Sequence, residues 1–132
     1  MISSVQFTAF YAGLLTLFYV ALSLRIIMLR RELRIGIGHG ESNRLHRVIR
    51  VHGNFAEFVP LALLLLMFLE LNGTASWVLN VLGTMLLFGR LLHSMGLSKS
   101  AGTSVGRLWG GLLTYTMMII AAALNMIPMY SF

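Results

Sequence analysis

The sequence predicts an all-α membrane protein, a transmembrane four-helix bundle in a single domain over residues 1–132, from three observations. Of the 132 residues, 58% are hydrophobic and only 11% are charged, and the mean hydropathy is +0.83. A soluble domain of this size could not bury so much apolar surface. Three apolar runs, over about 4–24, 75–92 and 108–128, are each close to the roughly 20 residues that span a hydrocarbon core as a helix.

A fourth apolar run, residues 58–69, is too short to span the membrane alone. At about 1.5 Å per residue it covers roughly 18 Å of a core that is roughly 30 Å thick. Its helix must begin earlier, so polar residues before Phe58 lie at membrane depth. Pro60 is tolerable because neighbouring helices can satisfy the freed carbonyl. We therefore expect helices over about 4–30, 43–70, 75–97 and 105–128.

The positive charges predict the orientation of these helices. The ten Lys and Arg residues lie in or beside the first and third connections, whereas the connection "LNGTAS" and both termini carry none. The positive-inside rule places the two basic connections in the cytoplasm and both termini outside. The net charge of +6 and the pI near 10.9 therefore reflect membrane topology, and we expect no nucleic-acid partner.

The residue types also limit the chemistry. The chain has no cysteine, which excludes disulfides, thiolate metal sites and a protein thiol nucleophile, so any sulfur chemistry must come from a ligand. The four histidines show no HxxxH or HExxH spacing, and we expect no metal.

A polar stripe runs along one face of the second helix, at spacings of three and four. Its members are Asn43, His46, Arg47, Arg50, Gly53, Asn54 and Glu57. Such a stripe is expensive against lipid, so it must face other helices or a wet cavity. Further polar residues fall at the same level: Arg30, Arg31 and Arg34 at the end of the first helix, Arg90 and His93 on the third, and Arg107 on the fourth, followed on its face by Gly111 and Thr114.

Arginines grouped with one carboxylate and one amide suit a small anionic ligand that carries a free amine. Arginine forks bind carboxylates, and Glu57 would hold an ammonium group. Two other interpretations stay open. Arg50 and Glu57 can serve only to hold helices together, and the arginines near the first connection can contact anionic lipid headgroups, since membrane lipid is an expected partner in any case. Glu70 is expected at the outer membrane interface.

The stretch "RVHGNFAEFVP" (residues 50–60) resembles the R-x-x-x-N-x-x-E-x-x-P signature on the second helix of the MAPEG family, the membrane-associated proteins in eicosanoid and glutathione metabolism. The segments "LRRELRI" and "GRLLH", together with Arg107, fall in matching places. The resemblance covers nearly the whole chain, and it is closest to the small branch of the family found in the bacterial inner (plasma) membrane.

The resemblance implies a homotrimer of four-helix protomers that holds glutathione between adjacent subunits near the cytoplasmic face. It assigns Arg107 to stabilising the glutathione thiolate, and Arg31 as a second catalytic arginine. The binding residues that it implies are Arg30, Arg34, Arg50, Asn54, Glu57, Phe58 and His93. Leu97 and Gly111 depart from the pattern, because several relatives have tyrosines at these positions, and Gly53 stands where prostaglandin E synthase-1 has an arginine.

The resulting hypothesis is a glutathione S-transferase, a glutathione peroxidase, or both, acting on lipophilic small molecules. The first alternative is a non-catalytic glutathione- or lipid-binding membrane protein, which the missing tyrosines favour. The second is a small transporter, since transporters also use carboxylates within the membrane. Against a transporter, Glu57 lies in the cytoplasmic half and no polar stripe continues through residues 61–69.

Overall fold

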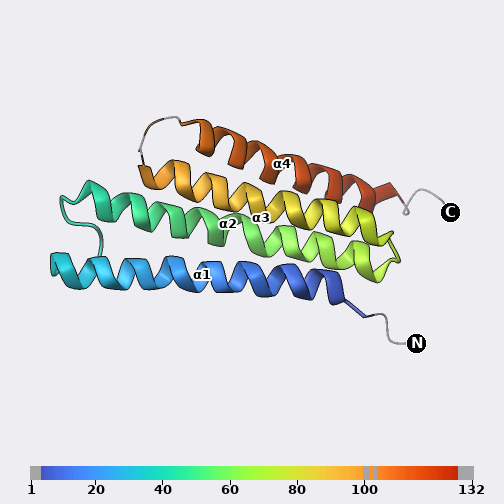
Figure 1. Ribbon diagram of the computed structural model, residues 1–132, viewed down its shortest axis with the longest axis horizontal. Coiled ribbons are helices and arrows are strands. Elements are labelled where there is room, and N and C mark those ends of the chain that lie inside the picture. Colours follow the sequence, from blue (N-terminus) through green and yellow to red (C-terminus); the bar gives the residue numbers. More distant parts are fainter. Residues whose placement is uncertain (1–3, 100–101, 103, 128–132) are drawn as a thin grey trace.

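The computed structural model describes residues 4–99, 102 and 104–127, and every regular element within them is a helix. The helices are α1 (Gln6–Leu33), α2 (Asn43–Leu71), α3 (Ser76–Lys99) and α4 (Val105–Met126). Each is long and apolar enough to cross a membrane. They lie side by side as a bundle, with the α1–α2 and α3–α4 connections at one end and the α2–α3 connection at the other (Figure 1). The predicted all-α four-helix bundle is confirmed.

The helix boundaries follow from local residue chemistry. α2 begins after Ser42, whose hydroxyl accepts a hydrogen bond from the backbone N–H of Leu45 (3.2 Å), and α4 begins after Ser104, which accepts one from Arg107 (3.2 Å). α1 ends at Leu33, three residues past the expected end at residue 30, and the next residue, Arg34, has a left-handed φ of 55°. Serine capping thus places Arg107 in the first turn of α4.

The pair α2 and α3 forms the centre of the bundle. α1 and α4 each pack against both of these helices, and they do not contact one another within the described residues. The core between the helices is mostly apolar, and its most deeply buried apolar side chains include Leu15, Leu66, Leu79, Leu82, Leu86 and Met117. The polar residues that do enter the bundle therefore need a specific explanation.

Glycines bring the backbones of α3 and α4 into direct contact. A Cβ atom added to Gly110 would collide with the backbone nitrogen of His93, and one added to Gly96 would collide with that of Arg107. Small residues at such positions allow membrane helices to approach closely. This packing fixes the backbone positions of His93 and Arg107 relative to each other.

Glu70 lies in the last turn of α2, at the opposite end of the bundle, and it is buried there. It is 9% exposed, and its carboxylate accepts hydrogen bonds from the backbone N–H groups of Phe7 (2.8 Å) and Thr8 (2.7 Å) at the start of α1. α1 has no capping side chain of its own. A carboxylate from α2 therefore caps α1, where helix N–H groups are otherwise unpaired.

Candidate functional site

An open cavity of about 440 Å³, which we call the basic cavity, lies between α2, α3 and α4. Its lining residues belong to the half of the bundle that ends in the α1–α2 and α3–α4 connections (Figure 1). Its lining residues are Asn43, His46, Arg47, Arg50, Asn54, His93, Leu97 and Arg107. Five of the seven residues of the polar stripe line it, and no lining residue is acidic. The stripe therefore faces neighbouring helices and a hollow between them.

Arg50 and Glu57 form an ion pair along the same face of α2. The Arg50 Nη1 and Glu57 Oε1 atoms are 3.4 Å apart, and the two side chains are 50% and 52% exposed. An ion pair with this distance and this solvent exposure contributes little free energy. Glu57 does not line the basic cavity but lies one turn beyond Gly53, where a carboxylate can reach its rim.

Asn54 is oriented by a buried arginine. Arg90 is 2% exposed, and its Nη1 donates a hydrogen bond to Asn54 Oδ1 at 2.6 Å. Because a guanidinium only donates, this bond fixes the amide oxygen toward Arg90 and leaves the amide NH₂ as the group that can act in the cavity. The Nε atoms of Arg90 and Arg47 are buried with no hydrogen-bond partner among the described residues. The site is thus rich in donors and poor in acceptors.

A second hollow of about 460 Å³, which we call the apolar groove, continues from the basic cavity along α4. The two hollows share Asn54, His93 and Arg107. The remaining lining residues of the apolar groove are Ser104, Leu108, Gly111, Leu112 and Tyr115. A charged compartment and a largely apolar one therefore meet at these three shared side chains.

Phe58 lies between the helices near this groove. Its ring meets the edge of Tyr115 at a centroid distance of 5.3 Å, and the Arg90 guanidinium carbon lies 5.9 Å from the Phe58 centroid. This contact places Phe58 on the side of α2 that faces α3 and α4. It also covers part of the buried Arg90 charge.

Arg107 stands at the junction of the two hollows. Its side chain is exposed, and its Nη1 donates to the carbonyl oxygen of Gly102 at 3.4 Å. His93 faces it from α3 and is 8% exposed. The first turn of α4 therefore holds one cationic side chain at the boundary between charged and apolar surroundings.

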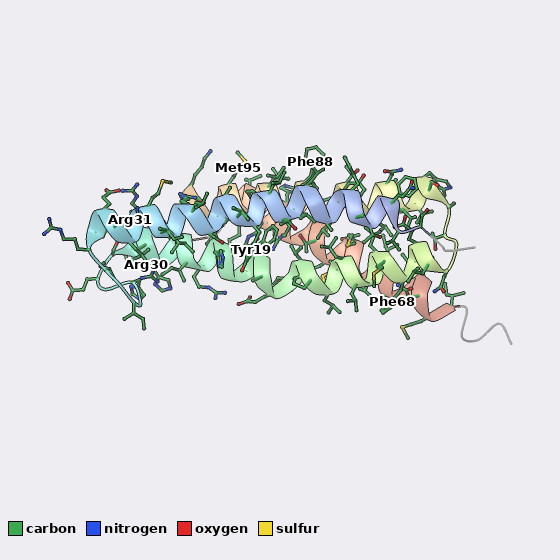
Figure 2. The ribbon with its side chains drawn as sticks, turned by 90° about the horizontal axis from the view of Figure 1, so that it is seen from below. Tyr19, Arg30, Arg31, Phe68, Phe88 and Met95 are labelled. Carbon is green, nitrogen blue, oxygen red and sulfur yellow. The ribbon has the colours of Figure 1, made fainter. Side chains whose placement is uncertain are left out.

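Three residues assigned by the resemblance lie away from the basic cavity within one chain. Arg30 Nη1 donates to the carbonyls of Ile35 (3.3 Å) and Gly38 (2.8 Å), so this side chain orders the α1–α2 connection. Arg31 and Arg34 are exposed at the same end, where Figure 2 labels Arg30 and Arg31. A single chain therefore brings together Arg50, Asn54, His93 and Arg107, but not the arginines that close α1.

Sequence reasoning overlooked Tyr115 and left Arg90 without a role. Tyr115 follows Arg107 and Gly111 at a spacing of four, which is the signal that could have identified it. Thr114 lies on the same face of α4 as Arg107, as expected; it is fully buried, and its hydroxyl donates to the Gly110 carbonyl (2.8 Å). Close packing of α3 against α4, with Gly89 opposite Thr114, buries this side chain.

The described residues contain no group of three or more His, Cys, Asp or Glu side chains that could hold a metal ion. His39 and His46 stack with ring centroids 4.3 Å apart, and His52 bonds Ser23 (3.0 Å) on α1. These histidines thus make contacts of their own, and His46 also lines the basic cavity.

Comparison with known proteins gives the same family as the motif. A model of the MAPEG family matches residues 8–127. The inner membrane protein YecN of Escherichia coli strain K12 is 38% identical over 89 residues, which cover 67% of this chain and 68% of YecN, and YecN of Escherichia coli O6:H1 matches equally well. The chain, an integral inner-membrane protein with four spans, belongs to the MAPEG family.

Proposed function

We propose that the protein binds glutathione in the basic cavity and transfers its sulfur to lipophilic electrophiles. The observation that carries this proposal is the junction at Asn54, His93 and Arg107, where a cavity suited to an anionic peptide meets a groove suited to an apolar molecule. A thiol carried in the first hollow would lie beside an acceptor in the second, which supplies proximity and orientation.

The cavity-lining groups match the charges of the tripeptide. Glutathione has two carboxylates, which guanidinium groups such as those of Arg47 and Arg50 bind bidentately. The NH₂ of Asn54 would donate to a carbonyl or carboxylate oxygen. Glu57 would hold the ammonium group, exchanging its loose 3.4 Å contact with Arg50 for the ligand.

Arg107 would favour the thiolate. An alkyl thiol has a pKa near about 8.5, so little of it is ionised at neutral pH. A guanidinium beside the sulfur stabilises the anion. In the transfer reaction the thiolate forms a bond to an electrophilic carbon and a leaving group such as halide departs with the bonding electrons. In the peroxidase reaction two glutathiones reduce one hydroperoxide to an alcohol and water, and are oxidised to one disulfide.

We also propose that the working form is a homotrimer with the ligand between subunits. Arg30, Arg31 and Arg34 lie away from the basic cavity of their own chain, so they could serve only a cavity of a neighbouring chain. Native mass measurement in detergent tests this assembly, and a monomer that binds glutathione with full affinity would exclude it.

The proposed orientation has the basic connections in the cytoplasm. Because the chain has no cysteine, single introduced cysteines report their side of the membrane. Cysteine at Asn72 should react with an impermeant thiol reagent added outside, whereas cysteine at Gly36 should not. The reverse pattern would invert the topology.

A binding protein without catalysis is the second candidate. Leu97 lines the basic cavity and Gly111 lines the apolar groove, and neither supplies the hydroxyl of the family tyrosine. A transporter has less support, because the half of α2 beyond Phe58 buries Ala62, Leu66 and Leu69 in an apolar cluster.

The test uses detergent-purified protein in two steps. Glutathione should raise the thermal midpoint, since a ligand that binds only the folded state stabilises it. The rate of conjugation of glutathione to an electrophilic aryl halide should then fall about 10- to 100-fold in Arg107→Ala, because the thiolate loses its counter-charge. The affinity for glutathione should change little.

Arg107→Lys should recover part of the rate. Arg44→Ala is the matched control, because Arg44 pairs with Glu32 outside the cavity (3.2 Å). Absence of any thermal shift at millimolar glutathione would reject the binding proposal. Binding without conjugation would identify the protein as a binder.

A further inference from the structure

A separate groove of about 270 Å³ lies between α1 and α3, and we call it the α1/α3 groove. Its lining residues are Phe18, Leu22, Arg25, Leu91, Ser94, Met95, Ser98 and Lys99. None of them lines the basic cavity or the apolar groove. α3 therefore contributes one face to the candidate functional site and a different face to this groove.

The α1/α3 groove is apolar along its length and basic at one end. Phe18, Leu22 and Arg25 succeed one another at helical spacing on α1, and Leu91, Met95 and Ser98 do so on α3. Met95 is 56% exposed and points away from the body of the bundle in Figure 2. An apolar chain laid in this groove would thus end beside the cations of Arg25 and Lys99.

The position of the cations corresponds to the lipid headgroup level. Residues 6–24 of α1 carry no charge, and at 1.5 Å per residue they span about 28 Å, close to the roughly 30 Å thickness of a hydrocarbon core. Arg25 is the first charge after this span, and Lys99 is the last residue of α3. The apolar part of the groove therefore lies at acyl-chain depth.

The two cations lack a carboxylate partner among the described residues. The ion pairs found there join Arg44 to Glu32 and Arg50 to Glu57. Arg25 Nη1 instead donates to Ser98 Oγ (2.9 Å), a bond that holds the guanidinium across the gap between α1 and α3. The charge at this end of the groove is thus complementary to an anion.

We propose that the α1/α3 groove binds an anionic glycerophospholipid. Its phosphate accepts hydrogen bonds from Arg25, Lys99 and the Ser98 hydroxyl, and one acyl chain lies against Phe18, Leu22, Leu91 and Met95. Basic pockets between membrane helices bind anionic headgroups in this way. A zwitterionic lipid fits less well because its own ammonium group opposes the two cations. The proposal is independent of glutathione binding.

The experiment compares delipidated, detergent-purified protein with phosphatidylglycerol and with phosphatidylcholine of identical acyl chains, using native mass spectrometry to measure binding. The wild type should prefer phosphatidylglycerol. The double variant Arg25→Gln/Lys99→Gln should bind it about 25-fold more weakly, at about fivefold for each basic residue near an anionic surface.

The control double variant Arg31→Gln/Arg44→Gln removes two positive charges at the same end of the bundle but outside the groove. Its affinity for phosphatidylglycerol should stay within about twofold of the wild type, because neither side chain lines the groove and distant exposed charges are screened. An equal loss in both double variants would mean unspecific attraction to the basic surface and would overturn the proposal.

A second variant tests the apolar part without changing charge. Met95→Trp fills the groove from an exposed position, so it should weaken phosphatidylglycerol binding and leave the thermal midpoint of the lipid-free protein unchanged. Binding of glycerol phosphate as tight as that of the lipid would overturn the acyl-chain role. Cross-linking of Met95→Cys to a neighbouring chain, with no protection by lipid, would make the groove an interface between copies instead and likewise overturn the proposal.

Discussion

The two glutamates of α2 differ in nearly every physical respect, although they share a helix. Glu70 is buried and accepts two short hydrogen bonds from the first turn of α1. Glu57 is half exposed and makes one ion pair of 3.4 Å with Arg50. The Glu70 carboxylate is hydrogen-bonded within the protein, whereas the Glu57 carboxylate remains accessible to a ligand.

The difference separates structural from functional polarity within the membrane. At the Glu70 end, a helix terminus presents unpaired N–H groups to an apolar core, and a carboxylate satisfies them. At the Glu57 end, donors outnumber acceptors around an open cavity. We infer that intramembrane charge serves folding at the first end and ligand binding at the second.

The largest expected effect is on stability at the Glu70 end. Glu70→Ala leaves the buried N–H group of Thr8 and the part-buried one of Phe7 without an acceptor, so we expect the free energy of unfolding to fall by about 2–3 kcal/mol. A lower thermal midpoint measures this loss. Glutathione affinity should not change, because thirteen residues, or about 20 Å, separate Glu70 from Glu57.

Glu57→Ala is the matched control, and it should lower the free energy of unfolding by less than about 1 kcal/mol because its ion pair is solvent-accessible. Equal destabilisation by the two variants would remove the distinction between the two ends.

The next effect concerns the amide of Asn54. Asn54→Asp keeps the acceptor for Arg90 and replaces the NH₂ donor with a negative oxygen. We expect glutathione affinity, measured by calorimetry, to fall about tenfold, the cost of losing one hydrogen bond to a charged group. The thermal midpoint of the Asn54→Asp variant should be equal to or higher than that of the wild type, because the acceptor for Arg90 is kept. Unchanged affinity would show that Asn54 faces only Arg90.

A smaller effect is expected for Glu57→Gln, which removes the counter-charge of the ligand amine. Glutathione binding should weaken about fivefold, in line with an exposed charge pair. N-acetylglutathione lacks the ammonium group, so its affinity should be the same for wild type and variant. If the variant bound glutathione and N-acetylglutathione equally more weakly than the wild type, the role of Glu57 would be only to hold Arg50.

The smallest effect is expected for Tyr115→Phe. The Tyr115 backbone lies eight residues, or about 12 Å, along α4 from Arg107, so its hydroxyl is remote from the proposed thiolate. The conjugation rate should stay within about twofold, and the ring contact with Phe58 is preserved. A tenfold loss of rate would place the phenol in the reaction.

Much of the fold could be predicted from the sequence because hydrocarbon thickness sets helix length. The apolar runs predicted four helices, and the short run after Phe58 correctly required α2 to begin among polar residues. Helical spacing also grouped Arg47, Arg50 and Asn54 on one face, and all three line the basic cavity. These features depend on periodicity within single helices, which a sequence contains.

Contacts between helices could not be predicted from the periodicity of single helices. Helical spacing correctly placed Thr114 on the face of Arg107, but it could not show that Gly89 of α3 packs against Thr114 and buries it. Glu70 was expected at the outer interface, but its hydrogen bonds to the start of α1 could not be predicted. In both cases the partner lies on another helix, and no local pattern specifies which helix that is.

By itself, therefore, the sequence determined the four spans, the asymmetry of charge and the polar face of α2, because each follows from the cost of placing charge in hydrocarbon. The tertiary structure decided which polar groups are hydrogen-bonded within the protein and which are left for a ligand. Arg90 is held by Asn54 and Glu70 by the first turn of α1, since a hydrogen bond forms only where two helices bring donor and acceptor within about 3 Å.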